Sequence, residues 1–174
     1  TTTGEDAAIL ILDLRDPSGS KVIPLYQPTT QTGVRDHTVV GVDALDWDAN
    51  SEMVIYDSFN RVLQGDGSSL EYWNVNLLRP DGEIIIPLLP PQPVGFQFGN
   101  PDFASTSGRY IVFDYFDQWT QQNSIVLYDL SNGSSSILAT TDSRPAHPRF
   151  SPDDEEIAYE FTGTDGSPSV ARLS

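Results

Sequence analysis

The sequence predicts an all-β protein made of β-propeller blades, which are four-stranded antiparallel sheets. One phrase recurs: an aromatic residue, a polar turn, then an apolar triplet that ends in a second aromatic residue. Its copies begin at Trp47, Phe103 and Phe150, which are 56 and 47 positions apart, and repeats of roughly 40–50 residues are typical of propellers and solenoids. In addition, 13 prolines and 13 glycines punctuate the chain, so no long window keeps a helical period.

The apolar triplets predict strands. They occupy residues 54–56, 111–113 and 157–159 and consist mostly of β-branched and aromatic residues, which favour strands over helices. Their apolar residues are consecutive rather than alternating, which is typical of strands that are buried on both faces. With the aromatic residue and turn before it, each triplet predicts one β-hairpin.

A second type of hairpin accompanies the first. Its copies occupy residues 9–24, 75–87 and 124–138, and their turns contain Asp, Asn and Gly. Glycine in such turns allows positive φ without steric cost. The repeating unit is therefore four strands in two hairpins, which is the composition of a propeller blade.

The repeats predict one partial propeller domain over residues 1–174. Its parts are a half blade at 7–25, full blades at 43–89 and 101–140, and an incomplete blade at 147–173. This is about three and a half blades, whereas propellers typically have four to eight. Because an open arc exposes strand edges, we expect a missing chain segment, self-association or another chain to complete the ring. The alternative is a closed four-bladed ring in which the two ends of the chain share one sheet.

Residues 148–159 resemble the repeat of a known family. They read Pro-Arg-Phe-Ser-Pro-Asp-Asp-Glu-Glu-Ile-Ala-Tyr. This is similar to the Pro-x-Phe-Ser-Pro-Asp-Gly turn and the following strand of the TolB-type, WD-like propeller repeat. The copies at Phe103 and Trp47 depart further from that pattern. Family members include periplasmic scaffolding proteins and propellers attached to prolyl-oligopeptidase-like hydrolases, so the resemblance implies the fold but not one function.

Composition excludes several classes of function. The chain has no cysteine, which excludes disulfides and thiolate chemistry. Its net charge of −16 argues against binding to nucleic acid or to anionic membranes, and no apolar stretch is long enough for membrane insertion. We expect an acidic periplasmic or extracellular protein, whose charge either gives solubility or attracts basic partners.

Catalytic motifs are absent from the sequence. It contains neither the Gly-x-Ser-x-Gly elbow of serine hydrolases nor a phosphate-binding loop. The two histidines, His37 and His147, are too few and too far apart for a zinc site. His37 is expected in a loop over residues 31–37, whereas His147 takes the place of Asn100 in the earlier repeat, which favours a structural or channel-facing role. We therefore expect no enzyme activity and no cofactor.

One segment has spacing similar to a calcium loop. The candidate ligands, which place oxygen atoms at alternate positions, are Asp46, Asp48, Asn50 and Asp57. Ser51 stands where such a loop needs glycine. The alternative interpretation is that this segment is simply the turn of a hairpin.

The ligand-binding candidates lie in two predicted loops between the second and third strands of each blade, at residues 58–69 and 115–123. They are Phe59, Asn60, Arg61, Tyr115, Phe116, Gln118 and Trp119. Loops on a rigid scaffold often carry function, and aromatic and arginine side chains dominate protein-binding hot spots. The alternative is that Phe116 and Trp119 pack against their own blade.

Three functions remain open from the sequence. The first is a non-catalytic scaffold that binds a protein or peptide. The second is the gating propeller of a prolyl-oligopeptidase-like hydrolase whose catalytic domain lies outside this chain. The third is calcium-dependent binding of carbohydrate or of a surface layer.

Overall fold

The computed structural model describes residues 7–25, 34–90 and 94–174, and these residues form antiparallel strands with one short 3₁₀ turn. The elements in chain order are β1 (Ala8–Ile11), η1 (Pro17–Gly19), β2 (Lys21–Pro24), β3 (Val34–Trp47), β4 (Val54–Gln64), β5 (Ser69–Leu78), β6 (Ile85–Pro87), β7 (Phe96–Phe103), β8 (Tyr110–Asp117), β9 (Gln122–Asp129), β10 (Ser134–Thr141), β11 (Arg149–Phe150), β12 (Ile157–Thr162) and β13 (Pro168–Leu173). The all-β fold class is therefore confirmed.

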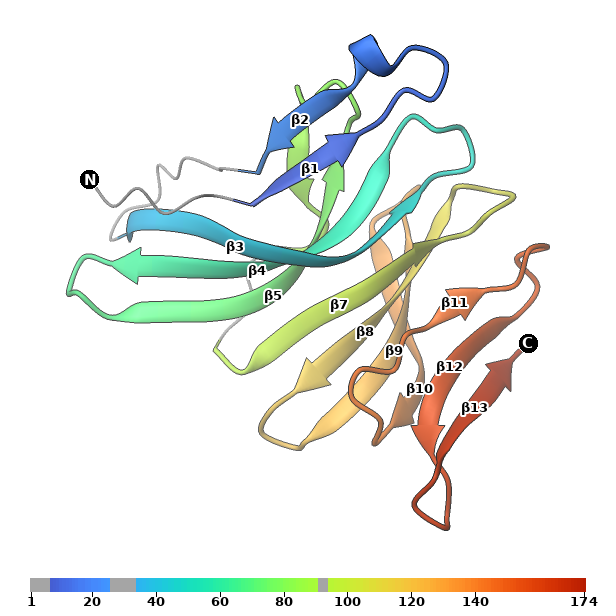
Figure 1. The fold of residues 1–174 in the computed structure, drawn as a ribbon. Coiled ribbons are helices and arrows are strands. Elements are labelled where there is room, and N and C mark those ends of the chain that lie inside the picture. Colours follow the sequence, from blue (N-terminus) through green and yellow to red (C-terminus); the bar gives the residue numbers. More distant parts are fainter. Residues whose placement is uncertain (1–6, 26–33, 91–93) are drawn as a thin grey trace.

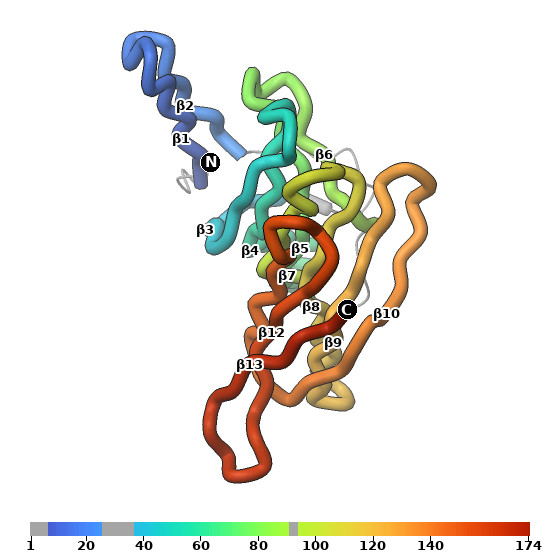
Figure 2. Tube along the Cα trace, turned by 90° about the vertical axis from the view of Figure 1, so that its right-hand side faces the viewer, coloured from blue at the N-terminus to red at the C-terminus, as the bar shows by residue number. Residues whose placement is uncertain are grey.

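The strands form four separate sheets that follow one another along the chain. Their orders are β1-β2, β3-β4-β5-β6, β7-β8-β9-β10 and β11-β12-β13. Figures 1 and 2 show the β1-β2 hairpin and the β11-β13 sheet at opposite ends of the row of sheets. Edge strand β7 contacts β3, β4, β5 and β11, so it lies where three sheets meet. This is the arrangement of successive propeller blades, with β3, β7 and β11 as the equivalent first strands.

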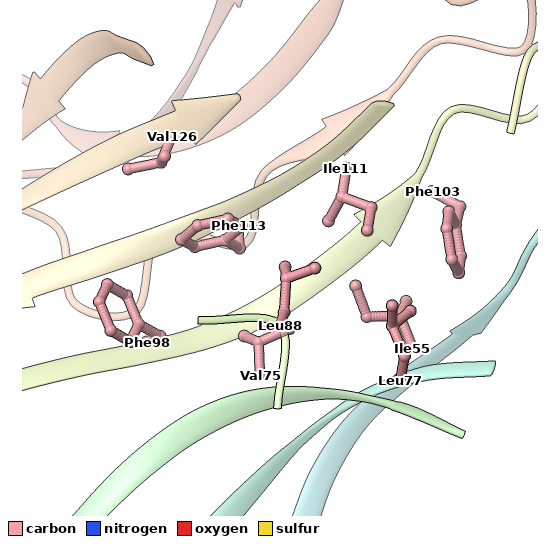
Figure 3. Close-up of a cluster of buried hydrophobic side chains, with 9 residues drawn as sticks. All are labelled: Ile55, Val75, Leu77, Leu88, Phe98, Phe103, Ile111, Phe113 and Val126. Carbon is pink, nitrogen blue, oxygen red and sulfur yellow. The ribbon is translucent and has the colours of Figure 1, made fainter. Parts of the chain in front are cut away.

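The apolar triplets are buried on both faces in the two four-stranded sheets, as their consecutive apolar residues predicted. Ile55 and Phe113, both 0% exposed, belong to the cluster between these sheets, where Phe98 meets Phe113 edge to face at 5.8 Å (Figure 3). Tyr56 faces the β1-β2 hairpin instead, and Val112 faces the β11-β13 sheet. Each of these two triplets thus packs its sheet against both neighbouring sheets.

The third copy of the triplet is buried on one face only. Ile157 belongs to the cluster with the preceding sheet, whereas Ala158 on the opposite face is exposed. On β13 the exposed Val170, at 71%, continues this open face.

The prediction of long loops between the second and third strands is wrong in both blades. β4 continues to Gln64 and β8 to Asp117, so the connections are short turns and most of the predicted loop residues lie in strands. The polar residues within 57–61 suggested a turn, but their backbone groups pair with β5 in an unbroken register. Likewise, His37 lies in β3 rather than in a loop, and residues 31–33 of that predicted loop lie outside the described residues.

Candidate functional site

A cavity of about 200 Å³ lies beside β7, at the meeting point of the sheets. Its lining combines carboxylates, amides, aromatic rings and one arginine. The lining residues are Asp43, Asp57, Trp73, Gln97, Phe98, Gly99, Asn100, Asp114, Phe116, Asn123, Arg144 and Pro145. Asp43, Arg144 and Pro145 are exposed, whereas Asp57, Asp114 and Asn123 are buried, so the cavity runs from the surface to a buried polar floor.

Asp57 is held in the floor by a bulge in β3. Residues 43 and 44 together oppose one residue of β4, which frees their amides from the strand ladder. Asp57 Oδ1 accepts hydrogen bonds from both amides, at 3.1 and 2.8 Å, and Oδ2 accepts a 2.8 Å bond from Asn100 N in the next sheet. The carboxylate therefore satisfies a bulge in its own sheet and ties that sheet to its neighbour.

Asp114 is the repeat equivalent of Asp57, because each directly follows an apolar triplet. Its Oδ2 accepts hydrogen bonds from Ala146 N at 2.9 Å, Asn100 Nδ2 at 3.0 Å and Asn123 Nδ2 at 3.4 Å. In the described part of the chain, no hydrogen bond ends on its Oδ1. One oxygen of this carboxylate thus remains an unused acceptor.

Asn123 supplies a second unused acceptor. Its Nδ2 donates to Asp114 Oδ2 and to Ser143 O at 3.1 Å, which fixes the orientation of the amide. Its Oδ1 is buried and has no hydrogen-bond partner, and the side chain lines the cavity. A buried carbonyl oxygen without a donor is unfavourable by about 1–3 kcal/mol.

Gly99 separates the two buried carboxylates. A β-carbon at this position would lie 3.3 Å from Asp57 Oδ2, which is a tight contact, and 3.4 Å from Asp114 Oδ1, at the lower limit of ordinary van der Waals contact. The two oxygens therefore approach one small space from two sides. In the following repeat the equivalent residue is Ala146, which is fully buried among apolar side chains.

The cavity is acidic, and its carboxylates take part in none of the ion pairs among the described residues. Burial raises the pKa of Asp57 and of Asp114, and the hydrogen bonds that each accepts only oppose this effect. Arg144 places its guanidinium 3.5 Å from the centre of the Phe116 ring.

The predicted ligand-binding residues do not form one site. Phe116 lines the cavity, and Phe59 contacts the cavity residue Trp73 with ring centroids 5.4 Å apart. Tyr115 likewise stacks on the cavity residue Phe98. The other predicted residues lie elsewhere: Asn60 is hydrogen-bonded to Ser58 and His37, Arg61 pairs with Glu71, and Gln118 and Trp119 lie in the β8-β9 turn. Trp119 is 69% exposed, but its indole lies over Gly95 of its own blade, where a β-carbon would be 2.5 Å from Nε1.

The predicted calcium ligands are also dispersed. Asp46 Oδ2 accepts from Phe103 N, Asp48 Oδ1 accepts from the amides of Glu52 and Met53, and Asp57 is engaged as described above. Asn50 is exposed in the turn between β3 and β4. The pairing of Trp47 with Val54 closes this turn. The described residues contain no group of three or more His, Cys, Asp or Glu side chains that could hold a metal ion. The geometry supports the alternative, a hairpin turn.

The predicted equivalence of His147 and Asn100 is visible in the backbone. Both have positive φ, 45° for His147 and 51° for Asn100. Asn100 lines the cavity, whereas His147 Nδ1 lies 3.2 Å from Glu160 Oε1.

Sequence reasoning missed Gly99, Asp114 and Asn123. A signal for Asp114 was present, because an aspartate directly follows two of the three apolar triplets. Gly99 also departs from its repeat equivalent, Ala146. Nothing comparable marks Asn123, since its role depends on which side of β9 faces the cavity.

Comparison with solved structures shows that the chain has a β-propeller fold. It is similar to the β-propeller domain of the Trilobed protease from Pyrococcus furiosus (13% identity, TM-score 0.50, covering 76% of this chain and 35% of that one). It is also similar to a putative TolB from Agrobacterium tumefaciens (14% identity, TM-score 0.50, 95% and 65%) and to oligogalacturonate lyase in complex with manganese (14% identity, TM-score 0.50, 87% and 39%). The chain thus spans between 35% and 65% of the length of these three proteins.

No family model and no curated protein matches the sequence. Among the described residues, no helix has the length and apolar character needed to cross a membrane.

Proposed function

We propose that this chain belongs to a non-catalytic, TolB-like β-propeller scaffold that is exported and binds a protein or peptide. The partner lies over the surface where the β7 cavity opens. The proposal is supported by the sequence, which has no catalytic motif, and by the mixed lining of the cavity.

The observation that carries the proposal is the size and chemistry of this cavity. Its volume of about 200 Å³ is smaller than the roughly 300–1,000 Å³ of typical small-molecule sites, and is closer to the size of one side chain. Trp73, Phe98 and Phe116 provide apolar contact area, and Asp43 and Arg144 provide polar groups at the mouth. Aromatic anchors surrounded by a polar rim are typical of protein-binding surfaces.

The test is selection from a random peptide display library, followed by affinity measurement on the enriched peptides by calorimetry. Arg144→Ala at the cavity mouth is expected to weaken binding. The matched control is Arg61→Ala, because this exposed arginine pairs with Glu71 away from the cavity. Failure to enrich any peptide, or equal affinity for both variants and the wild type, would count against this function and this surface.

The gating propeller of a hydrolase is the second candidate. The similarity to the propeller domain of a protease supports it, although at 13% identity this similarity concerns the fold. Reading the parent gene distinguishes the two: a downstream α/β-hydrolase domain with a Gly-x-Ser-x-Gly elbow would favour the gating role.

A further inference from the structure

We propose that the β7 cavity is a recognition site for a primary ammonium group of a peptide, supplied either by a lysine side chain or by a free amino terminus. This inference rests on the proposed peptide-binding function and assigns its chemistry. The ammonium nitrogen lies between Asp57 and Asp114, beside Gly99.

The first argument is the set of unused acceptors. Asp114 Oδ1 accepts no hydrogen bond within the described chain, and Asn123 Oδ1 is buried without a partner. Both residues line the cavity, together with Asp57. Unused oxygen acceptors on the floor of the cavity favour a ligand that donates hydrogen bonds there. An ammonium group has three N–H donors and no acceptor, which complements this set.

The second argument is the space itself. The oxygens of Asp57 and Asp114 approach the same point, 3.3 and 3.4 Å from where a Gly99 β-carbon would lie. A compact ammonium fits such a convergence better than the planar fork of a guanidinium, which is suited to one carboxylate. The aromatic rings of Trp73, Phe98 and Phe116 then provide an apolar wall for the carbon chain of the ligand.

The negative charge of the cavity also favours a cationic ligand. The cavity contains three carboxylates, and none of the described ion pairs includes any of them. Arg144, the one cation among the described lining residues, lies against the Phe116 ring. A bound cation would offset the cost of burying Asp57 and Asp114.

A metal ion is a poorer occupant. Asp57 already accepts three backbone hydrogen bonds, and Asp114 accepts three bonds on Oδ2. Few carboxylate lone pairs therefore remain for the six to eight oxygen ligands that calcium takes.

The test uses three peptides and NMR titration of the ¹⁵N-labelled chain. N-acetyl-Gly-Lys-Gly-amide carries only a side-chain ammonium, and Gly-norleucine-Gly-amide carries only a terminal ammonium. N-acetyl-Gly-norleucine-Gly-amide carries neither and has the same backbone. Binding of either charged peptide, with shifts at the Gly99 and Asn100 amides and the Asn123 side chain, supports the proposal and identifies the source of the ammonium.

Gly99→Ala is the decisive variant, since its methyl group fills the space between the carboxylates. It is expected to weaken binding of the charged peptide by at least ~10-fold. It should fold, because alanine stands at the equivalent place in the next repeat. The matched control is Gly41→Ala on β3, whose new methyl group meets nothing within 4 Å and should leave affinity unchanged.

Asp43→Asn is a second variant. Because Asp43 is exposed, this change leaves the buried carboxylates Asp57 and Asp114 in place. It should weaken binding at low salt, while Glu155→Gln in the β11-β12 turn should not. Equal binding of the uncharged peptide, retained affinity in Gly99→Ala, or the same NMR shifts with calcium chloride alone would each overturn the proposal. If peptides selected from the library bind without depending on an ammonium group, the ammonium site fails while the peptide-binding function stands.

Discussion

Asp102 provides a quantitative test of how adjacent sheets are joined. Its side chain, 15% exposed, leaves β7 and accepts a 2.7 Å hydrogen bond from Phe150 N in the β11-β13 sheet, and Arg149 Nε lies 3.7 Å from Oδ1. Burial raises the pKa of this carboxyl from its ordinary 3.8 to about 6, although the amide and Arg149 favour the charged form. The burial of the charge therefore outweighs the two favourable contacts.

The sign of the pH effect follows from this shift. A carboxyl whose pKa is higher in the folded state stabilises the fold when it is protonated, so its contribution is fully present below pH 3.8 and is lost as the pH rises through about 6. A shift of about two pKa units corresponds to about 3 kcal/mol in the free energy of unfolding. Asp102→Asn removes the ionisation while keeping an oxygen that accepts from Phe150 N. At pH 7 the variant should be more stable than the wild type by up to ~3 kcal/mol, less the lost attraction to Arg149.

The assay is urea unfolding of both proteins between pH 4 and 7, with the carboxyl titration of Asp102 followed by ¹³C NMR. The difference between the two proteins should grow from near zero at pH 4 and level off above pH 6. Asp153→Asn is the control: hydrogen bonds from Ser151 and Glu155 hold the pKa of that exposed carboxyl below its usual range, so its effect lies below this window. A titration of Asp102 at or below pH 4, or a variant that is less stable at pH 7, would refute the reasoning.

Three further predictions concern the core, an ion pair and a turn. Phe113→Ala removes a fully buried ring from between two sheets and should lower the free energy of unfolding by about 3–5 kcal/mol in denaturant titrations, with a loss under 1 kcal/mol contradicting the packing. Arg109 donates hydrogen bonds to Asp129 at 2.9 and 2.5 Å and holds the pKa of that carboxyl well below its usual range. Arg109→Met should therefore raise the pKa of Asp129 in a carboxyl NMR titration. An unchanged pKa would exclude the ion pair. Gly95→Ala should lower the melting temperature, because Gly95 has a φ of +103°, which alanine adopts only with strain. It should also alter Trp119 fluorescence, because the new methyl group would lie 2.5 Å from the indole nitrogen. A variant that matches the wild type in both measurements would show that Trp119 does not pack there.

The core of the fold could be predicted from the sequence because its determinants are local. The triplets at 54–56 and 111–113 are apolar at consecutive positions, so their strands must pack against other sheets on both faces. This requirement does not depend on the number of blades. Strand ends were less predictable. Ser58 and Asn60 are polar and therefore resemble turn residues, but they lie in β4, where Ser58 Oγ accepts hydrogen bonds from Asn60 Nδ2 and Asn76 Nδ2.

The candidate site could not be predicted in the same way, because it depends on contacts between repeats. Asp57 and Asn100 are 43 positions apart in the sequence, and their hydrogen bond requires the bulge in β3 and the approach of β7. The cavity depends further on the absence of one methyl group at Gly99. Repeat alignment can identify such a position as unusual, but only the packed sheets show that two carboxylates face it.

The differences between repeats also bear on the open face of the β11-β13 sheet. Asp102 and Asp114 each accept a hydrogen bond from a backbone amide of that sheet or of the segment leading into it, but their equivalents within it are Arg149 and Glu160. Glu160 is already paired with His147, and Arg149 Nη1 donates to the carbonyl oxygens of Asn100 and Pro148 at 3.3 and 2.8 Å. A guanidinium cannot accept an amide hydrogen bond. Any sheet that packs on the face of Ala158 and Val170 must therefore be held by contacts other than the two aspartate bonds that join the β7-β10 sheet to the β11-β13 sheet.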